Sequence, residues 1–178
     1  YEERMLPFSL SRGCVRGCLF CIDRKIFSHY QSRPAEMVVQ EIKHHYYKYG
    51  ITRFRSHDLL INGDLKNLER FAELLIKEKI KITWDCQAIC REMPLTLFYK
   101  LKKSGLGAIL FGVESASNKV LKRMNKMHTA EIAQRNIRYA KLMGIEVIIN
   151  ILVGLPGEEE EDFIETMKFI EKNKDYLH

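Results

Sequence analysis

Short apolar segments alternate with segments of helical periodicity along the whole chain, and this alternation limits the fold more than any other feature. The apolar runs, each bounded by glycine or polar residues, cover residues 6–9, 52–56, 81–85, 108–113 and 146–153. Between them apolar residues recur every three or four positions, and Gly50, Gly105 and Gly144 follow three of these segments as helix stops. Regular alternation of strand and helix predicts βαβ units with right-handed crossovers and one parallel sheet.

The number of units decides which parallel folds are available. The chain contains about five to six βα units, whereas a closed (β/α)₈ barrel has eight and usually takes about 250 residues. An α/β fold follows, either a partial parallel (β/α) barrel of the truncated TIM type or an open doubly wound sheet. In both folds, functional residues gather at the carboxyl ends of the strands. No linker divides the sequence, so we expect one domain over residues 1–178.

The composition is that of an ordinary globular protein in a reducing compartment. Hydrophobic residues make up 46% of the 178 residues and charged residues 29%, and the net charge of +6 favours an anionic partner only weakly. Five cysteines, an odd number, fit reduced thiols better than a disulfide framework. Without an apolar run that could span a bilayer or a secretory segment, we expect a cytoplasmic protein. Because the first residue is Tyr1 and not Met, we interpret the sequence as a segment of a longer protein.

Three of the five cysteines lie within the eight residues CVRGCLFC, directly after the first expected strand: Cys14, Cys18 and Cys21. A structural zinc site needs four ligands, and Cys86 or Cys90 could supply the fourth. A ferredoxin-type cluster takes four cysteines, so a cluster held by three leaves one iron open for chemistry. The single tight loop favours the open cluster over zinc or a disulfide. Cys86 and Cys90 are interpreted as small buried core residues.

The cysteine loop matches the pattern CxxxCxΦC, with Phe20 as the aromatic residue Φ. Five further stretches accompany it: SRGC before the loop, HDLLINGD after the second strand, FGVESAS on the fourth, VLKRMNK after it and NILVGLPGE on the fifth. Together they resemble the radical S-adenosylmethionine (SAM) superfamily over nearly the whole chain. They are most similar to the branch in which many members carry a separate cobalamin-binding domain ahead of the core.

This resemblance implies a partial (β/α)₆ barrel and a [4Fe–4S] cluster ligated by Cys14, Cys18 and Cys21. The amino and carboxylate groups of SAM would chelate the fourth iron. One electron from a donor of the flavodoxin or ferredoxin type would then release a 5′-deoxyadenosyl radical that abstracts hydrogen from a substrate. Cobalamin would bind through a separate domain. Because the radical chemistry belongs to the cofactor, we expect no catalytic triad or acid–base pair in the chain.

The resemblance also implies which residues bind SAM, all of them in the cysteine loop or near strand ends. Phe20 would lie near the adenine. Many members hold the SAM amino group with a Gly-Gly-Glu motif after the second strand, and since this chain lacks it, Asp58 or Asn62 with Gly63 would take its place. The other candidates are Glu114 with Ser115 for the methionine or ribose, Arg91 for the SAM carboxylate, and Asn150, which points into the barrel or at a neighbouring backbone.

Three functions remain open at this point. The first is the catalytic core of a radical SAM enzyme that performs cobalamin-dependent methyl transfer or a rearrangement. The second is a methylthiotransferase-like enzyme that modifies tRNA or protein, and the third is a non-catalytic zinc or iron–sulfur binding module. The basic run of residues 119–126 is interpreted as a solvated helix face, so we do not expect a nucleic-acid partner. The sequence does not specify the substrate.

Overall fold

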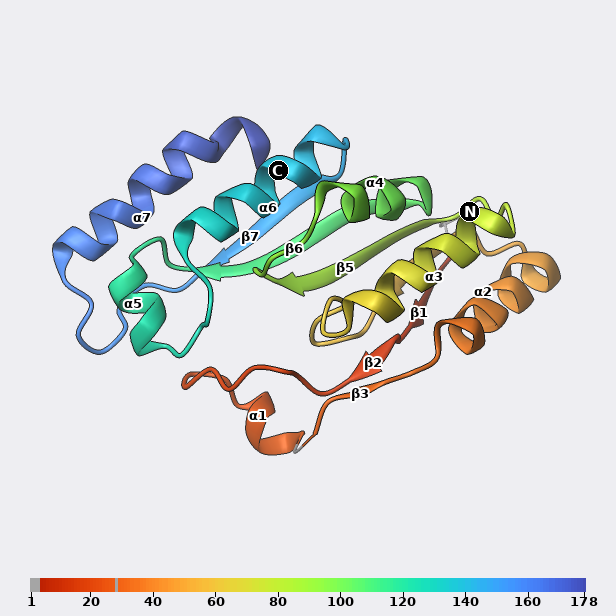
Figure 1. The fold of residues 1–178 in the computed structure, drawn as a ribbon, viewed down its shortest axis with the longest axis horizontal. Helices are drawn as coiled ribbons and strands as arrows, with labels where there is room; N and C mark the ends of the chain where they lie inside the picture. The colour runs from red at the N-terminus through yellow and green to blue at the C-terminus, as the bar shows by residue number, and fades with distance from the viewer. Residues whose placement is uncertain (1–3, 28) are drawn as a thin grey trace.

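The computed structural model describes residues 4–27 and 29–178, and its centre is a five-stranded parallel sheet (Figure 1). The strands cross the sheet in the same order as in the chain, β1-β4-β5-β6-β7. They are β1 Met5–Phe8, β4 Arg53–Ser56, β5 Thr83–Ile89, β6 Leu106–Glu114 and β7 Glu146–Ile151. A doubly wound sheet reverses its strand order at a switch point, and this sheet does not. The fold is therefore a partial barrel of the TIM type, and the doubly wound alternative is wrong.

Helices connect the parallel strands and cover one face of the sheet (Figure 1). The connecting helices pack in chain order, α2 on α3, α3 on α4 and α4 on α6. The long helices are α2 Ala35–Tyr49, α3 Leu65–Lys77, α4 Leu95–Lys103, α6 Ala130–Leu142 and α7 Glu160–Asn173. Short elements complete the chain: α1 Asp23–Ile26, α5 Asn118–Arg123, η1 Lys174–Tyr176, and a two-stranded antiparallel ribbon of β2 Ser11–Arg12 and β3 Gln31–Ser32.

Three helices begin at side chains that cap their free backbone N–H groups. At the start of α3 the side chain of Asp64 accepts a hydrogen bond from Asn67 N. Ser117 accepts from Val120 N at the start of α5, and Thr129 accepts from Ile132 N at the start of α6. At the other end of α2, Gly50 adopts φ +65°, a left-handed conformation that ends the helix. These caps fix where each loop leaves the carboxyl edge of the sheet.

The hydrophobic core lies between the sheet and the connecting helices. Its centre is a group of three aromatic rings from β1, α3 and β5, with ring centroids 5.4 Å apart for Phe8 and Phe71, 6.0 Å for Phe8 and Trp84, and 5.5 Å for Phe71 and Trp84. Along β5 the buried residues alternate with partly exposed ones, so Trp84, Cys86 and Ala88 face the helices. These contacts anchor the sheet to the helices that cover this face.

The opposite face of the sheet is concave and partly polar, as expected for the lumen of an incomplete barrel. It contains a cavity of about 450 Å³ whose lining includes Arg55, His57, Gln87, Leu110 and Ile148. The strand β5 that crosses this face ends at Ile89, not at residue 85 as the sequence indicated. Cys86 and Gln87 therefore lie inside the strand, because the alternation of buried and polar residues continues past Asp85.

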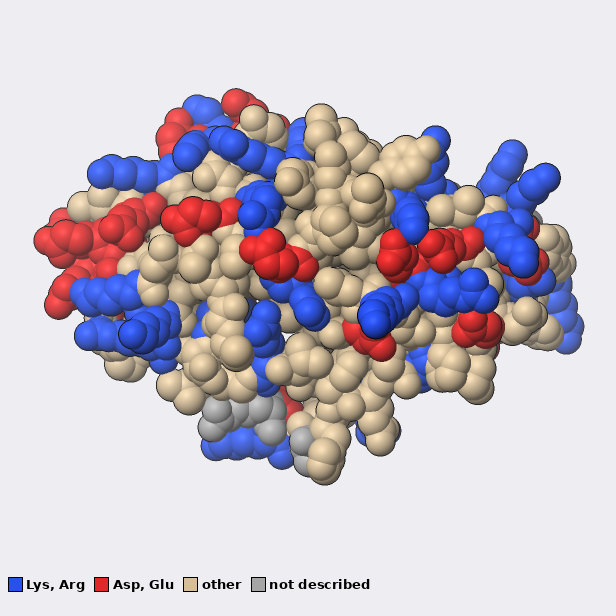
Figure 2. Space-filling view, in the orientation of Figure 1, with Lys and Arg blue, Asp and Glu red and all other residues tan. Residues whose placement is uncertain are grey.

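Charged side chains are distributed unevenly over the surface. Figure 2 shows acidic side chains gathered over the start of α7, where Glu160, Glu161 and Asp162 occupy the first turn. Carboxylates at this position are stabilised by the helix dipole. Among the described residues, no helix combines the length and hydropathy needed to cross a bilayer.

Candidate cofactor site

The three clustered cysteines lie in the loop between β2 and α1, beyond the carboxyl end of β1. Cys18 is buried, Cys14 and Cys21 are half-buried, and all three are free thiols. Gly13, directly before the loop, adopts φ +81°, and a Cβ at this position would lie 2.2 Å from the carbonyl oxygen of His29. Only glycine satisfies both conditions, so Gly13 sets the direction in which the chain enters the cysteine loop.

The turn formed by residues 124–127 holds the cysteine loop in place. Leu19 N donates a hydrogen bond to Met124 O at 3.0 Å, and the side-chain amide of Asn125 donates to Gly17 O at 3.0 Å. Asn125 and Met127 have φ values of +59° and +49°, so the backbone bends sharply on both sides of Lys126. The bend turns Lys126 inward from the end of α5.

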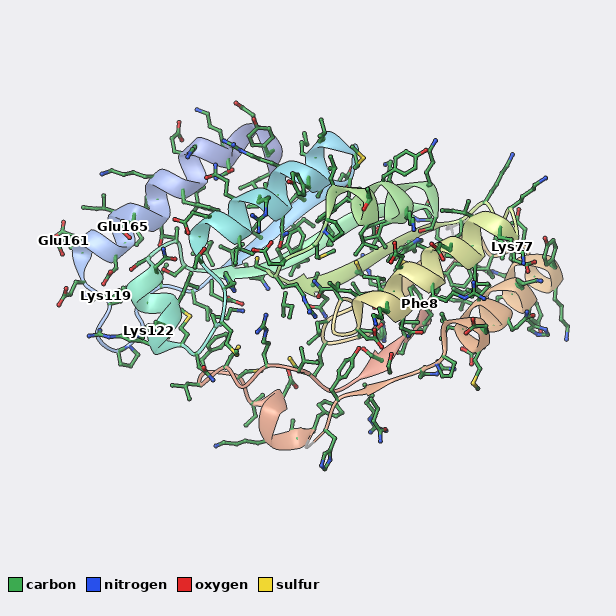
Figure 3. The ribbon with its side chains drawn as sticks, in the orientation of Figure 1. Phe8, Lys77, Lys119, Lys122, Glu161 and Glu165 are labelled. Carbon is green, nitrogen blue, oxygen red and sulfur yellow. The ribbon has the colours of Figure 1, made fainter. Side chains whose placement is uncertain are left out.

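The helix α5 that precedes this turn is itself fixed to α7. Ser117 Oγ donates to Asp162 Oδ1 at 2.7 Å, and Lys119 Nζ lies 2.5 Å from Glu159 Oε2 and 3.1 Å from Asp162 Oδ2. Figure 3 shows Lys119 and Lys122 on α5 beside the start of α7, where Glu161 is labelled. The acidic first turn of α7 thus positions the segment that holds the cysteine loop.

A buried ion pair joins this turn to the end of β6. Lys126 Nζ lies 3.0 Å from Glu114 Oε1, and the two side chains are only 7% and 9% exposed. The same ammonium lies 5.5 Å from the ring centroid of Phe20. A Cβ on Gly112 would lie 2.8 Å from Glu114 Oε1, so a side chain at this position would have to displace the carboxylate. The structure therefore brings Phe20 and Glu114, both expected in the site, together with Lys126.

Lys126 is the residue that sequence reasoning missed, and the interpretation of residues 119–126 as one solvated helix face is wrong for it. The helix α5 ends at Arg123, three residues before Lys126. Lys126 lies outside the helical period, in a turn with two left-handed residues, and it is buried. The asparagine at 125, a residue type that tolerates left-handed backbone, was the one local signal of this turn.

Burial and neighbouring charges shift the pKa values of the Cys14 and Cys18 thiols. Burial raises the pKa of Cys14 and of Cys18 above the ordinary value, and the negative charge of Cys21 adds to the increase at both. The Lys126 ammonium opposes this increase, because a positive charge favours the thiolate. Arg16, between Cys14 and Cys18, has a buried Nε without a hydrogen-bond partner. Lys126 and Arg16 thus place positive charge beside the cysteine loop, which suits a group that binds thiolates and carries negative charge.

The donor set fits a cluster better than a single ion. Among residues 4–27 and 29–178, no three His, Cys, Asp or Glu side chains are grouped so that they could hold one metal ion. Thiolates that each bind a different iron of a cluster do not need to converge on one point. Cys86 and Cys90 lie in the hydrophobic core, and burial raises the pKa of Cys90 to about 12. Such thiols are poor metal ligands, because the ligand is the thiolate.

Asp58 anchors the chain that leads into the cysteine loop. Its carboxylate accepts hydrogen bonds from Leu10 N at 3.1 Å, from Ser11 Oγ at 2.6 Å, from the backbone N–H of Ser11, and from Ser56 Oγ at 2.5 Å. The side chain is almost fully buried. Both carboxylate oxygens are already occupied by the protein, so these contacts give Asp58 a positioning role beneath the loop.

Asn62, Gly63 and Arg91 form a second group, between the β4–α3 loop and the end of β5. The side chain of Asn62 accepts from Ile89 N at 3.1 Å and donates to Ile89 O at 2.9 Å, which ties the loop to the strand. Arg91 Nη1 donates to Asn62 O at 2.9 Å and to Gly63 O at 3.0 Å. Burial lowers the pKa of Arg91, and the charge of Arg16 lowers it further. Both contacts use the same nitrogen, Nη1, of the Arg91 guanidinium.

The side chains of Ser115 and Asn150 lie in different parts of the fold. Ser115 Oγ lies 3.2 Å from Thr166 Oγ1 in α7 and accepts from Ser117 N at 3.1 Å, and the residue is fully buried. Asn150 is exposed and pairs with Gly112 in the sheet, on the face of β7 that also carries Ile148. Asn150 therefore faces the barrel lumen, one of the two orientations expected from the sequence, and Ser115 packs between α5 and α7.

The fold and the cysteine loop define a partial-barrel protein that presents three thiols at the carboxyl edge of its sheet. The family model of the radical SAM superfamily matches residues 8–170, so the chain belongs to this superfamily. A radical SAM methyltransferase from Kitasatospora setae, TsrM, has a similar structure, with a TM-score of 0.87 and 16% identity over 97% of this chain and 34% of that one. Its structures contain tryptophan and a SAM analogue in one case and cobalamin and a [4Fe–4S] cluster in another.

Two curated relatives are enzymes. An uncharacterized methyltransferase of Pyrococcus horikoshii is 26% identical over 176 residues, which are 97% of this chain and 38% of the relative. The tRNA-2-methylthio-N(6)-dimethylallyladenosine synthase of Fusobacterium nucleatum is 29% identical over an alignment of 186 positions, which covers 96% of this chain and 42% of the relative. The chain thus spans about two fifths of the length of these relatives.

Proposed function

We propose that this chain is the catalytic core of a radical SAM enzyme that binds a [4Fe–4S] cluster through Cys14, Cys18 and Cys21. When bound and reduced by an external donor, such a cluster would supply the one electron needed to cleave SAM into methionine and a 5′-deoxyadenosyl radical. The observation that carries the proposal is the cysteine loop itself, which is held against residues 124–127 by two hydrogen bonds of 3.0 Å. A loop fixed in this way would hold the three cysteines in place for a cluster.

Within this proposal the chain supplies charge, orientation and exclusion of water. Lys126 stabilises the thiolates and offers its ammonium to the carboxylate of SAM, while Glu114 holds that ammonium at 3.0 Å and accepts from the SAM amino group or ribose. The Arg91 guanidinium is a second candidate for the SAM carboxylate. Phe20 covers the adenine side of the site. Asp58, Asn62 and Gly63 act through the backbone that they fix.

Two partners belong to the proposal. A small electron-transfer protein of the flavodoxin or ferredoxin type would deliver the electron. Cobalamin would bind in a separate domain of the full-length protein, and this part is supported by the cobalamin in a structure of TsrM, whose fold this chain shares. Methyl transfer to carbon is the reaction that fits this combination.

A methylthiotransferase is the second candidate function. It is supported by the 29% identity to the Fusobacterium nucleatum synthase over 96% of the chain. Such an enzyme would use the same cysteine loop and the same SAM-binding residues, and would differ in the group that it transfers.

Anaerobic reconstitution with iron and sulfide tests the common core of both functions. We expect a brown protein with about four irons and four sulfides per chain that cleaves SAM to 5′-deoxyadenosine when dithionite is added. The variant Cys18→Ala should lose the cluster and the cleavage. Cys86→Ala, a matched loss of one thiol in the core, should keep both. A colourless protein that holds one zinc through the three loop cysteines would overturn the proposal.

An assay of the full-length protein distinguishes the two candidate reactions by their products. With SAM labelled in its methyl group and cobalamin present, a methyltransferase yields a labelled product without new sulfur. A methylthiotransferase yields a product that contains sulfur in addition to the labelled methyl group. Mass spectrometry of the product distinguishes the two.

A further inference from the structure

Basic side chains gather at the edge of the sheet opposite the cysteine loop. The strands β4 to β7 begin at this edge and the helices α2, α3, α4 and α6 end there (Figure 1). Figure 2 shows Lys and Arg along this edge, at the right of the view, and Figure 3 labels Lys77 among them. We call this group the amino-edge cluster, and its members are Lys48, Arg53, Lys77, Lys79, Lys81, Lys102, Lys103 and Lys141.

The fold explains only part of the amino-edge cluster. Five of its lysines occupy last helical turns, where the helix dipole favours a cation: Lys48, Lys77, Lys102, Lys103 and Lys141. Lys79 and Lys81, in the connection between α3 and β5, occupy no last helical turn. Within the described part of the chain, no salt bridge joins any lysine of the cluster to a carboxylate. Because like charges repel, these lysines are suited to an external anion.

A hollow lies in the middle of the amino-edge cluster. Its volume is about 540 Å³, and its lining includes the cations Arg53, Lys81 and Lys103 and the hydroxyl side chains of Thr52 and Thr83. All five residues are exposed, and each of their side chains is of a type that can donate hydrogen bonds. Converging cations and hydroxyl donors match the oxygen atoms of a phosphate group.

Exposed tyrosines stand beside the cations. Lys48 Nζ lies 5.2 Å from the ring centroid of Tyr49, and Lys103 Nζ lies 5.6 Å from that of Tyr99. Both rings, and that of Tyr47, belong to residues that are more than half exposed. An exposed aromatic ring beside a cation offers a base a stacking surface next to a phosphate contact, and this arrangement is typical of proteins that bind single strands.

We infer that the amino-edge cluster binds a single-stranded polynucleotide, with phosphates in the hollow of Arg53, Lys81 and Lys103 and bases stacked on Tyr49 and Tyr99. This partner was not expected from the sequence, where only the run 119–126 was considered, at the other edge of the sheet. The inference is independent of the proposed function, because the cluster lies at the opposite ends of the strands from the cysteine loop.

Fluorescence anisotropy of a labelled 20-residue oligouridine with the purified protein tests the inference, with an oligodeoxythymidine of the same length as the second arm. We expect the logarithm of the affinity to fall linearly with the logarithm of the salt concentration. The double variant Lys81→Gln/Lys103→Gln should bind about tenfold more weakly and reduce the salt slope by about 1. The matched control Lys168→Gln/Lys172→Gln, which removes two exposed charges from α7, should bind like the parent protein.

Two further variants test other contributions to oligonucleotide binding. One tests whether the tyrosine rings contribute by stacking and not by charge, and the other tests whether binding depends on the iron–sulfur cluster. Tyr49→Ala/Tyr99→Ala should weaken binding about tenfold with an unchanged salt slope. Cys18→Ala should bind the oligonucleotide as tightly as the parent, whatever the outcome of reconstitution. Circular dichroism checks that each variant is folded, and the exposed Lys79→Gln replaces the double variant Lys81→Gln/Lys103→Gln if that one is not.

Three results would overturn the inference. The first is no saturable binding of either oligonucleotide at low salt. The second is an equal loss of affinity in the α7 control, which would mean binding by net charge alone. The third is binding to phosphatidylserine vesicles, but not to oligonucleotides, that is lost in Lys81→Gln/Lys103→Gln, which would make the surface a membrane contact. Tighter binding of the RNA than of the DNA probe, or the reverse, identifies the natural strand.

Discussion

The ammonium of Lys126 lies 3.0 Å from the Oε1 atom of Glu114, and this buried pair links the turn after α5 to the last residue of β6. Glu114 itself has φ +68°, so the strand ends in a left-handed residue that directs its carboxylate across Gly112. The same lysine faces Phe20 of the cysteine loop. One side chain thus connects three segments that lie far apart in the sequence.

Removing the ammonium should destabilise the fold. Lys126→Met leaves the Glu114 carboxylate buried without a partner, and we expect the free energy of unfolding to fall by about 3 kcal/mol. Lys126→Arg keeps the charge and should retain most of the stability. Urea unfolding of the three proteins measures the difference. Equal stability of Lys126→Met and the parent would show that Glu114 has another partner.

Glu114 and its neighbour Ser115 should respond differently to substitution. Glu114→Gln removes the charge on the site side, and we expect SAM to bind about tenfold more weakly to the reconstituted protein with the cluster intact. Ser115→Ala removes a hydroxyl that contacts Thr166, and it should lower stability without changing SAM affinity. Equilibrium dialysis with labelled SAM compares them. An unchanged affinity in Glu114→Gln would place this carboxylate outside the site.

The entry into the cysteine loop depends on Gly13. Gly13→Ala combines the strain of a positive φ with a Cβ that would lie 2.2 Å from the His29 carbonyl oxygen, so we expect a loss of about 3 kcal/mol or a displaced loop with less bound iron. Gly50→Ala is the matched control, since φ is +65° and no atom lies within 4 Å of the added Cβ. It should cost only about 1 kcal/mol. Similar losses in both variants would mean that the contact with His29 relaxes freely.

His128 should make stability dependent on pH. Burial, together with the charge of Lys126, lowers its pKa from 6.5 to about 4 in the folded protein. The unfolded chain therefore binds the proton more tightly, so the stabilising effect is complete above pH 6.5 and declines as the pH falls toward 4. Between pH 8 and pH 5 this amounts to about 2 kcal/mol. Urea unfolding at both pH values should show a smaller decrease for His128→Gln, and an identical decrease would assign the effect to other groups.

Asp58 should matter for the order of the cysteine loop. Asp58→Asn replaces one acceptor oxygen by an amide group that faces N–H and O–H donors from Leu10, Ser11 or Ser56. An unsatisfied buried donor costs about 2 kcal/mol. Hydrogen exchange should also become faster at residues 10–21, while α6 keeps its protection. Slow exchange at these residues in the variant would show that the loop is held from the α5 side alone.

The sequence was sufficient for a parallel sheet of alternating strands and helices and for the position of the cysteine loop after its first strand, whereas the order of the strands across the sheet came from the structure. Short apolar runs and helical periods depend on local spacing, which a sequence contains directly, and each of the five expected strands overlaps one that is present. The ends of strands were less certain, as β5 shows, because a polar residue such as Gln87 can continue a strand that faces the lumen. The ribbon of β2 and β3 is too short to produce any pattern.

Only part of the candidate site could be predicted from the sequence. Phe20 and Glu114 carried motif signals, whereas Lys126 is defined by two left-handed residues and a long-range contact with β6. Conversely, Asp58 and Ser115 stood at strand ends as expected, yet their polar atoms are used by the protein's own backbone and hydroxyl groups. Hydrogen-bond partners far away in the sequence decide such roles, and no local pattern encodes them.

The single tryptophan of the chain, Trp84, is fully buried between Phe8 and Phe71, and its indole N–H donates to Ser104 O at 3.1 Å. Its fluorescence therefore comes from one apolar environment at the junction of β1, α3 and β5. Unfolding exposes the indole to water and shifts the emission to longer wavelength. The molecule thus contains its own optical reporter of the core, so the unfolding experiments above need no added dye.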